Sequence, residues 1–355
     1  MNLYIYNEQV ELVGVFDSWI SLIWIERYRS AGSFEIYAPA TVNAVEALKP
    51  RMYVYRPDSQ TAMYIDTIEE QYDADNGHCI FARGYSIEGI MRKRVLQSTS
   101  KSLPMLTVIN NILSASPIPC LEITSSEYDV SFKITEGMRG YTLEEFLRYG
   151  CTQNEMDISY RITLIPDENK LKLELYGGRD ITEDMVFSEK YGTIANTVYS
   201  YSEEGCANLI ICQCGPIASE VECEYPLPSY TLGTAEGLER TERLVIVDPI
   251  ISIGYRLAGD SVVEYKYLNV KETLEDMKEA AAAEYQEYTE NFEAEAITDG
   301  YRKDWAVGDI VAVQNYINNS IYYKRIEQVQ ESFDINGTKI EPVFGEPLKT
   351  LRDLI

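Results

Sequence analysis

Residue types that commonly do chemistry are few in this sequence, and the single histidine is the first to consider. A Ser-His-Asp or Cys-His catalytic arrangement would have to use His78, with its partners delivered from elsewhere in the chain. His78 directly follows Asp75-Asn76-Gly77, a tripeptide typical of a tight turn between two strands. We interpret His78 as a turn residue, and a single histidine excludes a histidine-rich metal site.

Four cysteines fall within a short span and could converge on a metal ion: Cys206, Cys212, Cys214 and Cys223. Cys212 and Cys214 would share one face of a strand, as thiolates must to bind zinc together. Their spacing lacks the paired C-x-x-C of zinc knuckles, and the flanking residues are apolar. Buried thiols acting as small hydrophobic side chains are the favoured interpretation, and metal binding at the four stays open.

Other ligand-binding patterns are incomplete or missing. The stretch Asp73–Gly77 opens like a calcium loop, but its glycine comes one place early and the closing glutamate is missing. The sequence contains neither of the glycine-rich nucleotide-binding patterns, G-x-x-x-x-G-K-[ST] and G-x-G-x-x-G. Adjacent carboxylates are too common in so acidic a chain to mark a catalytic pair: Glu69-Glu70, Glu144-Glu145 and Glu203-Glu204. We therefore predict no catalytic, cofactor-binding or metal-binding residue, and no enzyme activity.

The overall charge disfavours some classes of binding partner. The 355 residues include 31 basic and 57 acidic ones, which gives a formal net charge of −26. Such a surface disfavours specific nucleic-acid binding and anionic membranes, since both need clustered Lys and Arg. We expect no membrane insertion, because no apolar run is long enough to span a bilayer. We also expect no secretory leader, because the first residues lack a basic stretch followed by an apolar run. The seven cysteines, an odd number, indicate reduced thiols and synthesis in a cytosol.

The clearest pattern is an internal repeat. Residues 63–84 read MYIDTIEEQYDADNGHCIFARG, and residues 322–345 read YYKRIEQVQESFDINGTKIEPVFG. With a one-residue slip at the turn, the matched pairs are Ile65/Ile326, Ile68/Val329, Glu70/Glu331, Tyr72/Phe333, Asp73/Asp334, Gly77/Gly337, Ile80/Ile340 and Gly84/Gly345. Asn-Gly between alternating apolar residues predicts a hairpin in each copy. The preceding stretches 52–55 and 309–313 also resemble each other as strands.

Periodicity places the remaining elements. Strands are predicted at 3–6, 19–25, 33–37, 52–56, 62–72, 78–84, 157–165, 170–176, 209–212 and 243–247. Helices are predicted at 41–48, 86–94, 103–115, 142–150 and 268–297. Thr41 is a predicted N-cap, and Thr142-Leu-Glu-Glu145 has the arrangement of a capping box. Residues 268–297 are expected to form one long amphipathic helix with glutamates on its solvated face.

Several segments in order resemble tail-tip hub proteins of long-tailed bacteriophages, which are similar to the central hub of contractile-tail baseplates. The segments are Trp19–Tyr28, Gly32–Ile36, Gly84–Arg94, Leu175–Asp180, Val307–Val311 and Val343–Pro347. The resemblance implies a homotrimer in which two related small β-barrels per chain form a pseudo-sixfold ring. It further implies a virion protein of the tail tip or baseplate, assembled in the bacterial host cytoplasm. Its expected partners are the tail tube, distal tail, spike or fibre and tape measure proteins, with DNA passing through the lumen during genome ejection.

The expected fold is β-rich α+β, divided into four parts. Residues 1–95 with about 181–204 form the first barrel, and 205–262 with 300–348 form the second. Residues 96–180 form an inserted α+β domain, and 263–299 form a helical insertion. Two alternatives stay open: a carbohydrate-binding or glycan-hydrolysing β protein, indicated by 28 tyrosines and many carboxylates, and a zinc-stabilised adaptor.

Overall fold

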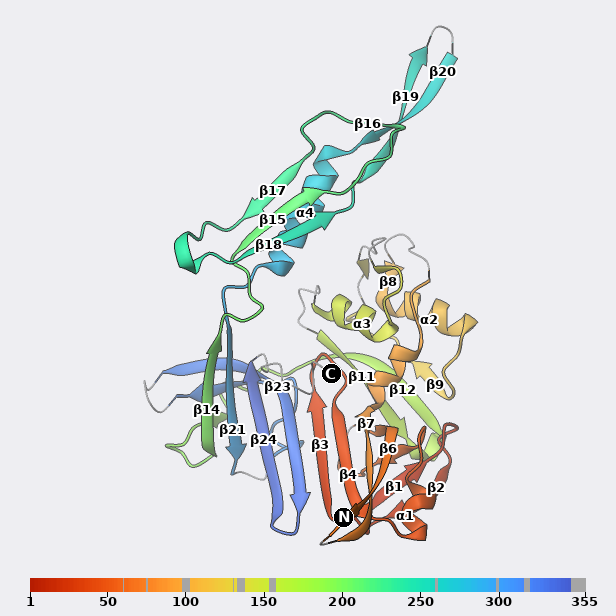
Figure 1. The fold of residues 1–355 in the computed structure, drawn as a ribbon, viewed down its shortest axis with the longest axis vertical. Coiled ribbons are helices and arrows are strands. Elements are labelled where there is room, and N and C mark those ends of the chain that lie inside the picture. The colour runs from red at the N-terminus through yellow and green to blue at the C-terminus, as the bar shows by residue number, and fades with distance from the viewer. Residues whose placement is uncertain are drawn as a thin grey trace. The chain divides into compact units, whose positions relative to one another are not determined.

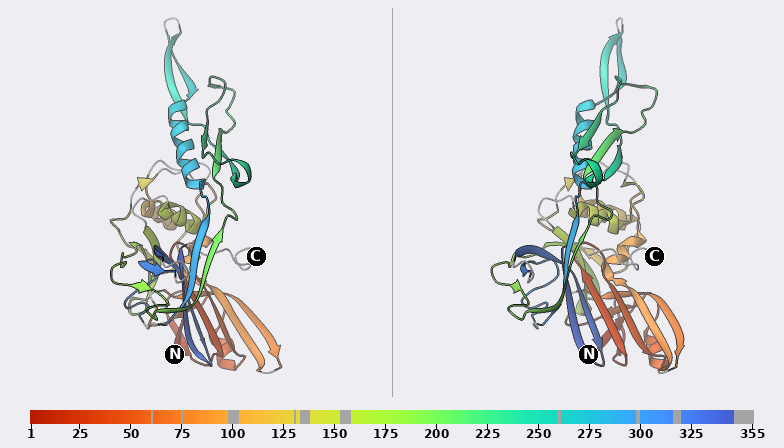
Figure 2. Two further views of the ribbon diagram at one scale, coloured as in Figure 1. Left: turned by 90° about the vertical axis from the view of Figure 1, so that its left-hand side faces the viewer. Right: turned by 60° about the vertical axis from the view of Figure 1, so that its left-hand side comes forward.

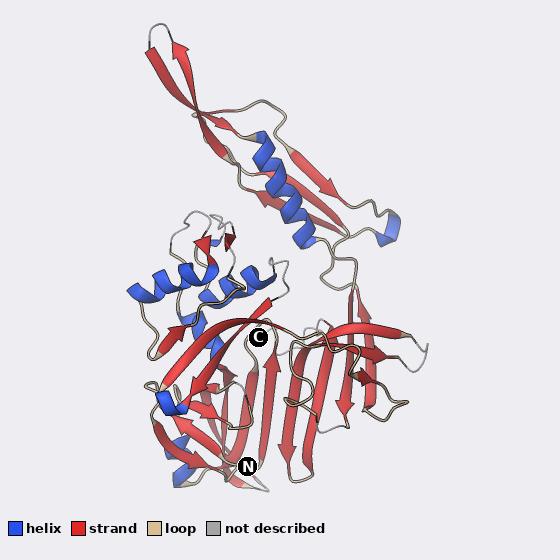
Figure 3. Cartoon of the chain, turned by 180° about the vertical axis from the view of Figure 1, so that it is seen from behind, coloured by secondary structure: helices blue, strands red, loops and turns tan. Residues whose placement is uncertain are grey.

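The computed structural model describes residues 1–59, 61–74, 76–97, 103–129, 131–132, 138–152, 158–258, 261–297, 300–315 and 320–345. Contacts divide the chain into two compact units, Met1–Tyr199 with Asn291–Ile355, and Ser200–Glu290. The chain is mainly strand, drawn in red in Figure 3. This confirms the β-rich character expected from the sequence.

The first unit is built on a 13-stranded sheet (Figure 1). Its strands are β1 (Leu3–Tyr6), β2 (Leu12–Phe16), β3 (Ser21–Arg27), β4 (Ser33–Pro39), β5 (Tyr53–Tyr55), β6 (Met63–Asp73), β7 (Gly77–Ser86), β13 (Val186–Phe187), β14 (Ile194–Ser202), β21 (Thr289–Ala296), β22 (Ile310–Gln314), β23 (Ile321–Asp334) and β24 (Gly337–Gly345). Hydrogen bonds join them in the order β14-β21-β24-β23-β3-β4-β7-β6-β5-β1-β2, while β22 pairs with β23 and β13 with β22.

Smaller elements complete the first unit. They are the helices α1 (Val42–Ala47), α2 (Met105–Ala115) and α3 (Leu143–Thr152), the 3₁₀ turns η1 (Ile87–Lys93) and η3 (Pro166–Glu168), and the strands β8 (Leu103–Pro104), β9 (Leu121–Ile123), β10 (Ser131–Phe132), β11 (Ile158–Ile165) and β12 (Lys170–Gly177). The predicted caps are confirmed. The Thr41 hydroxyl accepts from Ala44 N at 3.2 Å, and Glu145 N donates to the Thr142 hydroxyl at 3.2 Å while Thr142 N donates to the Glu145 carboxylate at 2.7 Å.

The second unit, Ser200–Glu290, carries its own small core around Ile210, Cys212 and Met277. Its elements are β15 (Leu209–Cys214), β16 (Val221–Glu222), β17 (Ser229–Leu232), η4 (Gly237–Glu239), β18 (Glu242–Val247), β19 (Ile251–Ala258), β20 (Ser261–Leu268) and α4 (Val270–Glu284). They form the sheets β17-β15-β18 and β16-β20-β19, and two further views of these strands and α4 are given in Figure 2.

The structure divides the chain differently from the four expected parts. In the described part of the chain, residues 205–262 do not pair with 300–348. Instead β24 pairs on its far side with β21, and β21 pairs with β14. The segment 181–204, expected in the first barrel, supplies β13 to β22 and β14 to β21. Strands expected in two barrels therefore share one sheet.

The predicted long helix over 268–297 is wrong in its second half. Helix α4 ends at Glu284, and β21 begins at Thr289. The four-residue step from Tyr288 to Phe292 fits a helix, but Phe292 and Ala294 are buried while Glu293 between them is exposed. That period of two belongs to a strand, and pairing with β24 selects it.

The repeat seen in the sequence is a duplication of five strands. We call β3, β4, β7, β6 and β5 module 1, and β14, β21, β24, β23 and β22 module 2; the two have the same order across the sheet. Phe34 of β4 faces Gly84, and Phe292 of β21 faces Phe344. Both phenylalanines are followed by glutamate and both are buried. Equivalent strands thus use equivalent register.

The two hairpins share an irregularity that the sequence does not reveal. In β6 the pairing register shifts between Ile65 and Thr67, and in β23 it shifts between Ile326 and Gln328, at the equivalent place. Bulges add twist at fixed positions and are retained features of a fold. The same bulge in both copies supports the origin of the two hairpins by duplication of one ancestral hairpin.

The start of each hairpin is held by the same pair of backbone hydrogen bonds. Arg51 N donates to Ile65 O and Gly308 N to Ile326 O, each at 2.8 Å. Ile65 N and Ile326 N donate in return to Met52 O and Asp309 O, each at 2.9 Å. Arg51 and Gly308 also share a left-handed backbone, with φ of +73° and +95°.

The turns explain the slip in the sequence alignment. Asp73 pairs with Gly77 across the first turn and Asp334 pairs with Gly337 across the second, so the first connection is one residue longer. One matched pair needs correction. Ile65 faces Gly84 whereas Ile326 faces Phe344, so the counterpart of Gly84 is Phe344 and not Gly345.

Candidate functional site at the junction of the modules

The two modules meet where β23 of module 2 pairs with β3 of module 1. The antiparallel pairing runs from Gln328 opposite Arg27 to Phe333 opposite Leu22. The Arg27 side chain donates to the Gln328 side chain at 2.8 Å across the seam. This junction joins two copies of one module, so its geometry shows how two such modules can pair.

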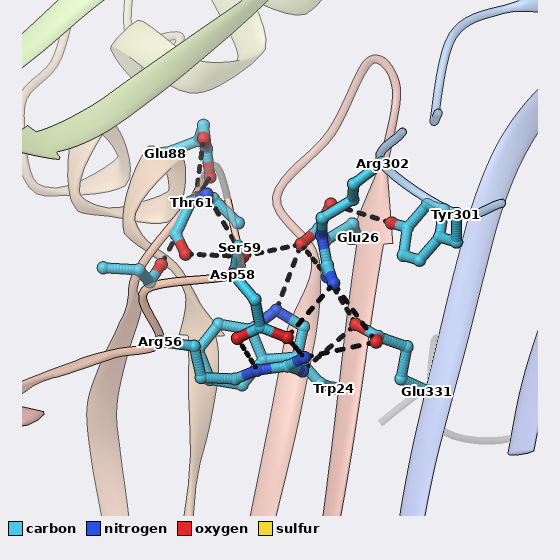
Figure 4. Close-up of polar contacts among 11 residues, drawn as sticks. Trp24, Glu26, Arg56, Asp58, Ser59, Thr61, Glu88, Tyr301, Arg302 and Glu331 are labelled. Carbon is cyan, nitrogen blue, oxygen red and sulfur yellow. Dashed lines mark hydrogen bonds and ion pairs between the residues drawn. The ribbon is translucent and has the colours of Figure 1, made fainter. Parts of the chain in front are cut away.

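A buried carboxylate of β23 lies at the centre of the junction (Figure 4). Glu331 is 4 % exposed and accepts from two arginines, Arg56, which directly follows β5, and Arg302 of the segment before β22. Arg56 Nη1 lies 3.1 Å from Glu331 Oε2, and Arg302 Nη1 lies 3.1 Å from Glu331 Oε1. Charged groups so far from water need such partners, because an unpaired buried charge is strongly destabilising.

Arg56 is fully buried, with 0 % exposure, and both modules enclose it. Its guanidinium lies 5.0 Å from the Trp24 ring centre and 4.7 Å from that of Phe333. Asp58 accepts from the same guanidinium at 2.6 and 3.2 Å. The planar cation can stack on aromatic rings while its edge serves carboxylates, a combination that lysine cannot provide.

Glu26 of β3 ties the same cluster together from the other side. It accepts from Arg302 at 2.7 Å, Ser59 at 2.8 Å and Tyr301 at 2.9 Å. Burial alone would raise the pKa of Glu26, but the Arg302 charge and these three hydrogen bonds hold that pKa below its ordinary value. Glu26 is therefore ionised in the folded protein near neutral pH.

A second buried carboxyl, Glu88 of η1, adjoins the cluster through Thr61. It accepts from the Thr61 hydroxyl at 3.1 Å and from Ile162 N at 3.0 Å. Burial raises the pKa of Glu88, and these hydrogen bonds offset only part of that effect. A cavity of about 40 Å³ is lined by Glu26, Thr61, Glu88, Tyr160 and Arg302 among others. That space suits a water molecule, so the cluster fits a structural clamp better than a substrate site.

The residues that the sequence marked for possible chemistry lie elsewhere. His78 lies on β7, exposed, with its ring 5.3 Å from that of Tyr72. Asp75 of the calcium-like stretch lies outside the described residues.

The four cysteines are all in the second unit as free thiols. Cys212 is buried, and its thiol donates to Met277 O at 3.4 Å. In the part of the chain that the structure describes, no three or more His, Cys, Asp or Glu side chains are grouped to hold a metal ion. Nor, within those residues, does any helix combine the length and apolar character needed to cross a membrane.

Sequence reasoning missed the clustered residues at the junction. Glu26, Arg56, Arg302 and Glu331 are far apart in sequence, and glutamate is too common here to stand out. One signal was present, because the repeat already matched Glu331 with Glu70 inside an apolar alternation. A carboxylate that interrupts a predicted core face needs a cation or hydrogen-bond donors, and that need could have prompted a search for arginines.

The first unit is a β-rich fold in which Arg56 and Arg302 join two like modules. Three solved structures have a similar fold over nearly the whole chain. They are the tail protein from Neisseria meningitidis MC58 (TM-score 0.61, 11% identity, 97% of this chain and 96% of that one), the prophage MuSo2 43 kDa tail protein from Shewanella oneidensis (0.60, 10%, 97% and 98%) and the prophage tail protein gp18 from Listeria monocytogenes EGD-e (0.53, 14%, 100% and 97%). No curated protein sequence matched the chain.

The sequence itself identifies the family. Residues 2–221 match the profile of the Siphovirus ReqiPepy6 Gp37-like proteins, and this chain belongs to that family. The resemblance to phage tail proteins noted from the sequence is thereby confirmed for family and fold.

Proposed function

We propose that this protein is a structural component of a phage or prophage-derived tail, acting as a homotrimeric hub between the tail tube and the distal tip. The observation that carries the proposal is the duplicated five-strand module, with both copies in the same order within one sheet. Three chains would present six like modules around one axis. Such a trimer could stack on a sixfold tube, because a closed ring needs matching patches at every contact.

Two further observations support the tail role. Family membership and the fold shared with tail proteins point to the same class of particle. The net charge of −26 would also suit a protein beside a DNA channel, since like charge keeps passing phosphate from adhering.

The partners follow from this position. The hub would contact the tail tube and distal tail proteins on one side, and spike, fibre or tip proteins on the other, with the tape measure protein inside. DNA would pass through the lumen on its way to the host. The virion tail tip is thus the proposed location, after assembly in the host cytoplasm.

The proposal is tested by the mass of the purified protein in solution. Light scattering across a concentration series should show a species of about three times the 40.5 kDa chain. A chain that stays monomeric at the highest attainable concentration would contradict the trimer. Co-purification with the tail tube protein of the same particle, compared with an unrelated tube protein, tests the tail position separately.

A further inference from the structure

One half of module 1 lacks the neighbour that its copy has. In β23, residues 321–325 pair with β22, and residues 328–333 pair with β3 on the same side of the strand. In β6, Met63 and Tyr64 pair with β5. The following residues, Thr67–Tyr72, pair within the described part of the chain only with β7. Among the described residues, no strand beside β6 takes the position that β3 occupies beside β23.

Equivalent residues of β23 and β6 differ in solvent exposure. Val329 and Glu331 are 1 % and 4 % exposed beneath the junction. Their counterparts are more exposed: Ile68 is half-buried, and Glu70 is exposed. Tyr72, the counterpart of Phe333, is 70 % exposed. The open edge thus carries the apolar and acidic pattern of a strand built for a junction.

A complementary edge lies at the other end of the sheet. Strand β3 has neighbours on both sides, β4 and β23, whereas its counterpart β14 has only β21 among the described residues. The sequence of β14, IANTVYSYS, carries no charged residue, so it would not repel an edge rich in glutamate. Val198 and Tyr201 of β14 are 51 % and 54 % exposed.

We propose that β14 of a second copy of this chain pairs antiparallel with Thr67–Tyr72 of β6, repeating between chains the β23–β3 junction found within one. The contact is head-to-tail, which is the type that closes into rings. The proposal rests on the proposed homotrimer and gives it an interface. It also accounts for an exposed edge strand, because such edges invite unwanted pairing unless another strand covers them.

The internal junction also shows which backbone groups would pair. Tyr28 N donates to Glu327 O at 2.9 Å, and Gln328 faces Arg27. Amides that point toward β3 therefore alternate and belong to Val329, Glu331 and Phe333. By equivalence, Ile68, Glu70 and Tyr72 direct theirs to the open edge.

Proline at Glu70 provides the test, because it removes one outward amide and leaves the amides that point to β7. Glu70→Ala is the matched control, since it loses the same side chain but keeps the amide. We expect E70P to weaken assembly of the full chain at least about tenfold relative to E70A, with unchanged circular dichroism and melting of the monomer. Hydrogen exchange on the wild type should show the Ile68, Glu70 and Tyr72 amides protected only in the assembled state.

The outcomes separate the two proposals. A wild-type trimer in which E70P and E70A assemble equally, with the three amides exchanging freely, would overturn the strand pairing and leave the homotrimer standing. A wild type that never assembles would overturn both. Should E70P unfold the monomer, the exchange measurement on the wild type decides the pairing alone.

Discussion

At the scale of residues, the junction depends on two arginines that neutralise carboxylates contributed by both modules. Arg302 is shared between Glu26 of β3 and Glu331 of β23, and Arg56 is shared between Glu331 and Asp58. Replacing a buried ion pair by apolar residues can leave stability unchanged. Removing only one partner leaves the other charged, unpaired and shielded from water. These contacts therefore specify how the two modules pack, and losing one of them should lower the free energy of unfolding.

Arg302→Ala should lower the free energy of unfolding of the first unit by about 3–5 kcal/mol, because Glu26 and Glu331 lose their shared cation. Urea denaturation followed by tryptophan fluorescence measures this, since Trp24 lies within the cluster. Lys170→Ala is the control. It removes an exposed pair with Glu122 and should leave stability nearly unchanged. Equal losses in the two variants would contradict the clamp.

The carboxyls of Glu26 and Glu88 should give opposite pH dependence. Because the folded pKa of Glu26 lies below its ordinary 4.5, its contribution is complete above that pH and is lost as pH falls through the folded value. The folded pKa of Glu88 is raised, so its contribution falls as pH rises above 4.5. In denaturation series across pH, Glu26→Gln should flatten the acid loss, and Glu88→Gln should raise stability at neutral pH relative to pH 4. Similar profiles for both variants would contradict these assignments.

At the scale of elements, the duplicated hairpins reproduce each other in bulge, register and backbone hydrogen bonds. The entry position of each hairpin is left-handed, occupied by Arg51 in one copy and Gly308 in the other. Only glycine adopts that conformation without cost. At Gly308 a Cβ would also lie 2.5 Å from the Tyr28 ring.

Exchanging residue types between these positions should therefore have unequal effects. Gly308→Ala should cost at least about 2 kcal/mol, from backbone strain and the clash with Tyr28. Arg51→Gly should change stability by no more than about 1 kcal/mol, because relief of strain offsets the looser unfolded chain. Thermal melting of both variants measures the difference. A harmless Gly308→Ala would contradict the described backbone.

Sequence reasoning found the local features of these elements and missed those that depend on distant pairing. The Asn-Gly turns and the capping box at Thr142 are written in a few adjacent residues, and both were predicted. The match of β4 with β21 rests on little more than Phe34-Glu35 and Phe292-Glu293, too short to see without the register. The same lack of context made 285–297 look helical. The junction site was out of reach because its residues meet only when the modules pair.

At the scale of the whole molecule, the second unit is an insertion into module 2. In module 1, β3 and β4 are joined directly by residues 28–32, whereas the equivalent strands β14 and β21 are joined by residues 203–288. That segment has its own core and sheets. It is therefore an inserted domain, and the duplicated modules do not depend on it for their strand order.

Replacing residues 203–288 by the module 1 connector, residues 28–32, should leave a folded first unit. The reason is that adjacent antiparallel strands need only a short connection, and β14 and β21 are neighbours in the sheet. Circular dichroism and melting of the shortened chain measure this. A shortened chain that is unfolded with the five-residue connector would contradict the equivalence of β14 and β21 with β3 and β4.

Twin modules in each chain would allow a threefold assembly to present six like surfaces. Electron microscopy of the purified full-length protein, viewed along the symmetry axis, tests this most directly. We predict a ring of three chains in which six modules alternate around one channel, with β14 of each chain beside β6 of the next. Particles with another number of chains, or with the two modules of a chain facing away from a common axis, would contradict it.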